Sequence, residues 1–263
     1  MAAKPLILLC NDDGVHAPGI KALAMAIEPL ADYVICAPHV ERSGSGQALS
    51  LTTPLRVERI ASNIYACEGT PTDCVMFAIL NLLPRKPDWV ISGINRGSNI
   101  GQDTLYSGTV AAAMEGCLHG VPAIAVSLKN SQAFELTDYS NAVHVVRTLF
   151  ANAGLLAPAK QGVLNVNIPA VPLADIRGFK VCGLGRRVYD SQIVPSVDPR
   201  GRPYYWIGGG GSEFLDIPGS DCVVLDQNFV TLSVLQPDHV HLEANAAING
   251  TIGNRLDQAL KAN

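Results

Sequence analysis

Two adjacent carboxylates follow the first apolar run of the chain. Asp12 and Asp13 come directly after residues 6–10, and a helix-like stretch begins near residue 17. In an open α/β sheet, ligands bind at the carboxyl ends of the strands, which is where this acidic turn falls. Adjacent like charges are costly unless they are solvated or neutralised, and a bound cation neutralises them. The turn therefore favours a hard metal site, although an acidic helix N-cap explains the same residues.

Later loops bring glycines, hydroxyls and amides toward the same edge. Residues 37–46 and 92–101 each follow an apolar run, and residues 106–109 open a helix of small residues. Glycines let backbone N–H groups approach an anion, and a helix N-terminus adds a favourable dipole. Each loop alone is a weak signal, since most Gly-Ser loops are ordinary turns. Together with the two carboxylates they supply oxygen ligands only, which suits magnesium or manganese and disfavours zinc.

Short apolar strands alternate with helical segments along the first two thirds of the chain. This alternation predicts an α/β fold with a parallel, doubly wound sheet that helices cover on both faces. The predicted strands are 6–10, 33–37, 89–92, 123–127 and 163–167. The predicted helices are 17–30, 72–83, 108–119 and 138–152, and an inserted hairpin pairs 55–60 with 63–67.

Asp73 is interpreted as a residue at a helix N-terminus. The sequence does not decide whether Glu115 is buried or solvated.

The character of the sequence changes after about residue 178. Residues 186–212 form two extended segments around a turn and carry Tyr204, Tyr205 and Trp206 before a tetraglycine. We interpret them as an arm that contacts a partner subunit, because a monomer has difficulty burying such aromatics; an ordinary surface hairpin is the alternative. The chain is thus divided into a catalytic core, 1–180, and a C-terminal portion, 181–263, with the arm and a terminal strand and helix.

The amino-acid composition excludes several classes of function. The chain is 48% hydrophobic and 16% charged, which is typical of a protein with a large core. Its net charge of -4 argues against nucleic-acid polymers and anionic membranes as partners, whereas a metal ion can still attract a small phosphate ester. The seven cysteines include no CxxC pair and are interpreted mostly as reduced core thiols. No apolar run is long enough for a signal peptide or a membrane helix, so we expect a cytoplasmic protein.

Several motifs, in order along the chain, resemble those of the SurE family, the survival-protein nucleotidases. They are residues 11–14 (NDDG), 37–38 with 42–44, 69–75 (GTPTDCV), 92–101 (SGINRGSNIG) and 103–110. The similarity covers roughly residues 6–128 and continues more loosely to about 240. It implies a Rossmann-like sheet and a metal-dependent phosphatase that cleaves 5′ and 3′ nucleoside monophosphates, with short polyphosphate as a further substrate. It also implies homodimers, sometimes paired into tetramers, with exchanged C-terminal segments.

The resemblance also implies roles for individual residues. One divalent cation per subunit, magnesium or manganese, is expected on Asp12, Asp13, Ser43 and Asn95, with the two aspartates also serving catalysis. The expected phosphate-binding residues are Asn11, Gly44, Asn99, Ser107, Gly108 and Thr109. Which aspartate activates the attacking water, and which group protonates the leaving alkoxide, stay open.

Two other functions compete with this interpretation. A phosphatase of the haloacid-dehalogenase type would use Asp12 as a covalent nucleophile, but those enzymes need two carboxylates separated by one residue. A nucleotide-binding module without turnover, like the universal-stress domains, would use similar loops. A Rossmann dehydrogenase is disfavoured because residues 10–19 contain no GxGxxG.

Overall fold

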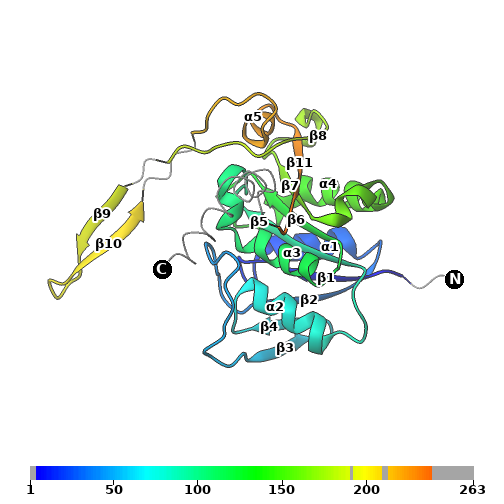
Figure 1. The fold of residues 1–263 in the computed structure, drawn as a ribbon, viewed down its shortest axis with the longest axis horizontal. Helices are drawn as coiled ribbons and strands as arrows, with labels where there is room; N and C mark the ends of the chain where they lie inside the picture. The colour runs from blue at the N-terminus through cyan, green and yellow to red at the C-terminus, as the bar shows by residue number, and fades with distance from the viewer. Residues whose placement is uncertain (1–3, 190–191, 209–212, 239–263) are drawn as a thin grey trace, which may run out of the picture.

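The computed structural model describes residues 4–189, 192–208 and 213–238, and within them a nine-stranded sheet forms the centre of the molecule (Figure 1). The strand order is β3-β4-β2-β1-β5-β6-β7-β11-β8. Neighbours from β4 to β7 run parallel, whereas β3 and β11 are antiparallel to β4 and β7. The strands are β1 (Leu6–Cys10), β2 (Asp32–Pro38), β3 (Val57–Ala61), β4 (Ile64–Cys67), β5 (Trp89–Arg96), β6 (Ala123–Leu128), β7 (Val163–Ile168), β8 (Phe179–Val181) and β11 (Val230–Leu235).

Helices cover both faces of the sheet. On one face α1 (Pro18–Ile27) packs beside α4 (Ser140–Ala151), and on the other α2 (Pro71–Phe77) packs beside α3 (Gly108–Leu118). Alternate residues of β1 enter the two cores: Ile7 and Leu9 join the α1 and α4 side, whereas Leu8 joins the other. This alternation follows from the period-2 geometry of a strand that is buried on both sides. The predicted doubly wound fold is confirmed.

The remaining helical elements are short. A π-helical turn, Ala78–Leu82, continues α2, and α5 spans Asp221–Asp226. The 3-10 segments are Gly101–Leu105, Leu136–Tyr139, Ala153–Gln161 and Leu173–Asp175. Within the described residues, no helix combines the length and the apolar character that crossing a membrane requires.

Strand β5 is longer than the predicted strand 89–92. The apolar run breaks at Gly93, but pairing with β6 resumes after a register shift, with Asn95 beside Ser127. Gly93 has a φ of 135°, and a Cβ there would lie 2.2 Å from the carbonyl oxygen of Val126. Glycine is therefore required at this irregularity, which places Asn95 at the carboxyl edge of the sheet.

The structure shows the positions of Asp73, Glu115 and the cysteines, whose roles the sequence analysis interpreted or left undecided. Asp73 occupies the third position of α2, where its side chain accepts from the Thr70 N–H at 2.8 Å and the Thr70 hydroxyl accepts from the Asp73 N–H at 3.1 Å. This capping box confirms the helix N-terminal interpretation. Glu115 is buried in α3, 3.0 Å from Nε2 of His119. All seven cysteines are free and most are buried, as predicted.

The predicted arm is a two-stranded antiparallel hairpin, formed by β9 (Gln192–Val197) and β10 (Pro203–Gly208). Figure 1 shows it projecting away from the sheet and its helices. Asp198 closes the turn by accepting from the backbone N–H groups of Arg200 and Arg202. The division of the chain at residue 180 stays a prediction, and β11 of the C-terminal portion belongs to the main sheet. The predicted terminal helix lies outside the described residues.

Candidate active site

The candidate residues lie where the strand order reverses. β1 lies between β2 and β5 in the sheet. The chain passes from β1 to its neighbour β2 in one direction, and it later continues from β5 to β6 and β7 in the opposite direction. Ligand sites of open α/β sheets form at this kind of switch point. The acidic turn after β1 is held to the loop after β2, because the N–H of Arg42 donates to the carbonyl of Asp12 at 2.7 Å.

Asp12 is buried against the N-terminal end of α3. Asp12 is 4% exposed, and the Thr109 hydroxyl donates to its Oδ1 at 2.5 Å. Burial raises the pKa of Asp12 to about 6, with the Thr109 hydrogen bond opposing the shift and the charge of Asp13 adding to it. A Cβ on Gly108 would lie 2.8 Å from the Cβ of Asp12. Only glycine therefore lets the first turn of α3 come this close to the carboxylate.

Asp13 contacts the end of β5 instead. The backbone N–H of Arg96 donates to its Oδ2 at 3.1 Å. Burial raises the pKa of Asp13, while the N–H and the charge of Arg96 oppose the shift. Two partly desolvated carboxylates thus stand next to each other in the sequence, each held by a different element. Both would gain from a nearby cation.

The hydroxyl proton of Ser43 and one amide N–H of Asn95 are donated to other groups. The Ser43 hydroxyl donates to Oε1 of Glu41 at 2.8 Å, and Nδ2 of Asn95 donates to the carbonyl of Gly97 at 2.8 Å. The lone pairs of the serine hydroxyl and of the amide oxygen are left for another partner. Glu41 also accepts from Nη2 of Arg96 at 3.3 Å, so it joins the loops after β2 and β5. Sequence reasoning missed Glu41, although an acidic residue two positions before a candidate ligand is a usable signal.

Of the candidate phosphate-binding residues, several lie at this edge. Asn11 is fully buried and donates through Nδ2 to the carbonyl of Gly14 at 2.9 Å, while its Oδ1 has no partner. Ser107 is the N-cap of α3, with its hydroxyl accepting from the N–H of Val110. Gly44 has a φ of 74°, and a Cβ there would meet no other atom within 4 Å.

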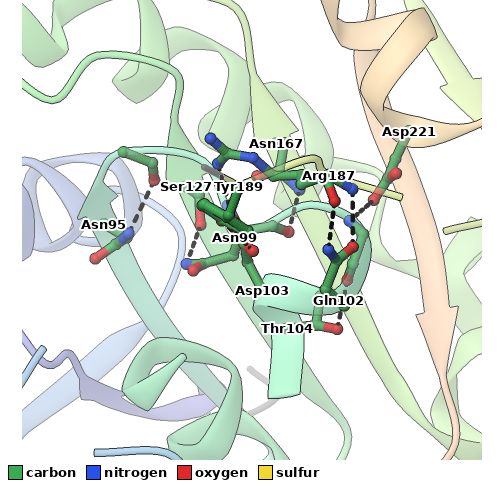
Figure 2. A network of polar contacts seen from close by, with 12 residues as sticks. Asn95, Asn99, Gln102, Asp103, Thr104, Ser127, Asn167, Arg187, Tyr189 and Asp221 are labelled. Carbon is green, nitrogen blue, oxygen red and sulfur yellow. Dashed lines mark hydrogen bonds and ion pairs between the residues drawn. The ribbon is translucent and has the colours of Figure 1, made fainter. Parts of the chain in front are cut away.

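Asn99 has a structural position. Its Nδ2 donates to the Ser127 hydroxyl at 2.9 Å, and its backbone N–H donates to Oδ1 of Asn167 at 2.8 Å. Its carbonyl accepts from the side chains of both Asn165 and Asn167. Figure 2 labels Asn99, Ser127 and Asn167 of this network. These contacts fix the loop after β5 to β6 and β7, and the predicted phosphate contact of Asn99 stays a prediction. The two buried asparagines alternate along the apolar strand β7, a pattern that sequence reasoning did not use.

A second polar network anchors the base of the arm. Nη1 of Arg187 donates to Asp103 at 2.8 Å, and the Tyr189 hydroxyl also donates to Asp103. Figure 2 draws these three residues together. Gln102 exchanges two hydrogen bonds with the backbone of Arg187, and Asp221 accepts from the N–H of Gly101. The segment that leads into α3 is therefore tied to the arm and to α5.

The donor set fits a hard divalent cation. No group of three or more His, Cys, Asp or Glu side chains in the described part of the chain is arranged to hold a metal ion. The candidate set instead combines two carboxylates with a hydroxyl and an amide, all oxygen ligands. Asn11 Oδ1 is buried without a hydrogen-bond partner, and burial raises the pKa of both aspartates, so this edge holds polar groups that a cation or a polar ligand would satisfy.

These features define a doubly wound α/β protein with an acidic, oxygen-lined site beside a helix N-terminus. Comparison with known proteins then identifies the family. Residues 7–191 match the family model described as "Survival protein SurE", and the chain belongs to the SurE family.

Individual relatives and a solved structure are also SurE proteins. The chain is 47% identical to the 5′-nucleotidase SurE of Geotalea daltonii over 242 residues, covering 92% of this chain and 97% of that protein. It is 45% identical to the 5′-nucleotidase SurE of Syntrophotalea carbinolica, covering 89% and 92%. The crystal structure of the SurE protein from Aquifex aeolicus superposes with a TM-score of 0.80 at 35% identity, covering 93% of this chain and 98% of that one.

Proposed function

We propose that this protein is a divalent-metal-dependent nucleotidase that hydrolyses nucleoside 5′-monophosphates to nucleoside and phosphate. The observation that carries the proposal is the buried Asp12 carboxylate in contact with the first turn of α3, next to Asp13. The names of relatives that are 45% and 47% identical support the substrate class. We also propose cleavage of 3′ esters and of short polyphosphate, and this part of the proposal is supported by the family resemblance alone.

Four residues supply the proposed cation ligands. They are Asp12, Asp13, Ser43 and Asn95, and one magnesium or manganese ion per subunit is proposed. When bound, such an ion withdraws electron density from the phosphoryl oxygens and lowers the pKa of water. The two neutral ligands leave net positive charge at the ion, which favours an anionic substrate.

The chain's own groups complete the chemistry. The first N–H groups of a helix have no partners within the helix, so the start of α3 at Gly108 offers a donor to phosphoryl oxygens. Thr109 contacts the Asp12 carboxylate, and its phosphate contact stays a prediction. The backbone N–H of Gly44, where the chain leaves open space for a ligand, is proposed as another donor. Donors that are already in place stabilise the charge that shifts onto these oxygens in the transition state. Asp12 or Asp13 orients the attacking water and accepts its proton.

We further propose that the protein forms at least a dimer through the arm. In the hairpin, Trp206 is 62% exposed and Ile207 is 93% exposed. Aromatic residues are enriched in the cores of protein–protein interfaces, so a partner surface would bury these side chains. A solitary two-stranded hairpin is marginal in water, so a partner surface accounts for its stability. The base of the arm is fixed by the contacts of Arg187 and Tyr189 with Asp103. A second copy of the chain is the proposed partner, and the cytoplasm is the proposed location.

Product analysis tests the function and separates its competitors. The protein is incubated with a panel of 5′ and 3′ nucleoside monophosphates and magnesium or manganese, and nucleoside and phosphate are quantified. We expect stoichiometric release of both over many turnovers. Nucleotide binding without release would indicate a binding module, and an acid-stable aspartyl-phosphate trapped on Asp12 would indicate the covalent mechanism.

A further inference from the structure

A small cavity lies beside Asp13, on the side of the sheet that α1 and α4 cover. Its volume is about 180 Å³, and its lining includes Asp13, Pro18, Arg96, Ala133, Phe134 and Tyr139. We propose that this cavity receives the nucleobase of the substrate, packed on the surface that Arg96 and Phe134 form together. The inference rests on the proposed nucleotidase function, because it assigns a place to the nucleoside part of that substrate.

The position of the cavity supports this assignment. Asp13, a proposed cation ligand, forms part of its wall, so a nucleotide whose phosphate is held at the acidic turn has its nucleoside within reach of the cavity. Three larger cavities, of about 550, 400 and 430 Å³, include none of the candidate metal or phosphate residues in their linings. The smaller cavity is therefore better placed for the group that the phosphate carries.

Its surface is suited to a flat ring. The guanidinium carbon of Arg96 lies 4.6 Å from the centroid of the Phe134 ring, and Phe134 is 57% exposed. Nucleobases stack on aromatic rings and on guanidinium planes, and both groups are present here. A single exposed phenylalanine is ordinary by itself. A phenylalanine that packs on an arginine next to a proposed metal ligand indicates a binding surface.

The surface is held in place before any ligand binds. The Arg96 backbone donates to Asp13 at 3.1 Å, and its guanidinium donates to Glu41 at 3.3 Å. The side chain that stacks on Phe134 is thus fixed to the residues of the metal site. Fixing such a group beforehand reduces the entropy that binding costs.

The size of the cavity limits what it can hold. Cavities that enclose a whole small ligand usually measure about 300–1,000 Å³, so about 180 Å³ suits one ring system with ribose and phosphate outside. Stacking uses the face of a base, which every base has, and therefore discriminates weakly among bases. We accordingly expect purine and pyrimidine nucleotides to be accepted with modest preference for the larger purine ring.

The test compares a substrate that has a base with one that lacks it. Steady-state kinetics of adenosine 5′-monophosphate and glycerol 2-phosphate are measured for the wild type, Phe134→Ala and Phe134→Leu. The matched control is Phe179→Leu, a half-exposed phenylalanine on β8 outside this cavity. We expect both Phe134 variants to raise KM for the nucleotide at least about 5-fold, while KM for glycerol 2-phosphate stays unchanged. The control should change neither.

A second readout keeps the inference separate from the proposed function. Binding of adenosine alone is titrated by calorimetry against the wild type, Phe134→Leu and Phe179→Leu. Weaker binding only in Phe134→Leu supports the subsite even if neither phosphate ester is hydrolysed, an outcome that would defeat the nucleotidase proposal alone. Equal adenosine affinity in all three proteins, or an equal KM change for both substrates, would overturn the subsite.

Discussion

Asp12 carries a charge that the fold disfavours unless a cation is present. Its carboxylate is buried, and the hydrogen bonds from the Thr109 hydroxyl and from nearby backbone N–H groups do not fully offset the loss of water. Its pKa of about 6 means that protons and cations compete for the carboxylate near neutral pH. The affinity of the site for a divalent ion should therefore fall as the pH decreases through about 6.

The same shift predicts how Asp12 affects stability without metal. Its folded-state pKa of about 6 lies above the ordinary value of 3.8, so the folded state binds more protons between these values. The contribution of Asp12 is most favourable below pH 3.8 and is lost as the pH rises through 6. In chelator at pH 7.5, Asp12→Asn should raise the free energy of unfolding by about 1–3 kcal/mol. Denaturant unfolding at pH 7.5 and pH 4 checks this, and a gain that is equal at both pH values would contradict it.

Asp13 should behave as a cation ligand and Asp73 as a helix cap. Asp13→Asn keeps the side-chain volume but removes a charged ligand, so the affinity for manganese should fall about 10-fold or more. Asp73→Asn disturbs the capping box with Thr70 and the hydrogen bond from Ser50, so it should cost about 1 kcal/mol of stability and leave manganese affinity unchanged. Calorimetric manganese titration, paired with thermal unfolding, measures both. Unchanged affinity in Asp13→Asn would disprove its assignment.

At the scale of elements, three loops from β1, β2 and β5 have to be held together. Glu41 joins two of them, the loop after β2 and the end of β5, by accepting from the Ser43 hydroxyl and from the Arg96 guanidinium, while the Arg42 N–H ties the turn after β1 to the loop after β2. A hydroxyl whose proton is held by a carboxylate is a better oxygen ligand, and such supporting groups are worth roughly 10-fold or more in metal affinity. Glu41 therefore acts as a positioning residue for the proposed cation site.

Substitution of Glu41 measures that contribution. We expect Glu41→Ala to weaken manganese binding about 10-fold, and Glu41→Gln, whose amide oxygen still accepts from Ser43, to weaken it less. Glu58→Ala, an exposed glutamate on β3, serves as the matched control. Calorimetry in which Glu41→Ala binds manganese as tightly as the control would remove Glu41 from the account.

The sequence predicted the elements near the site better than their ends. Apolar runs located β1 and β2, and the helical segments between strands located α1 and α3, because each of these elements is largely buried in the core. It did not show that β5 continues past Gly93, since the continuation depends on contact with Val126 of the neighbouring strand. The short helix α5 was missed as well, because six residues are too few for a helical period to register.

The candidate site shows the same division. The adjacent aspartates and the glycine loops could be predicted because their residue types indicate chemistry. The contacts of Glu41, Asn165 and Asn167 could not, because they join segments that lie far apart in the sequence. Family resemblance supplied the roles of Ser43 and Asn95, which periodicity does not address.

At the scale of the whole molecule, the arm indicates assembly. Deletion of residues 188–206 removes the exposed aromatics of the hairpin but leaves Arg187 and the nine-stranded sheet, so smaller species with a folded core and lower stability are expected. Light scattering at micromolar concentration should give the intact chain a mass of at least a dimer. A mass near 27.8 kDa for the intact chain would refute this expectation.

The most direct test of the central claim is phosphate release from adenosine 5′-monophosphate by protein that has been stripped of metal. We expect no release in chelator, full recovery when manganese or magnesium is added, and no recovery at the same metal concentration in Asp13→Asn. Circular dichroism of each sample shows that the fold is retained. Full activity of the wild type in a verified metal-free preparation would contradict the account.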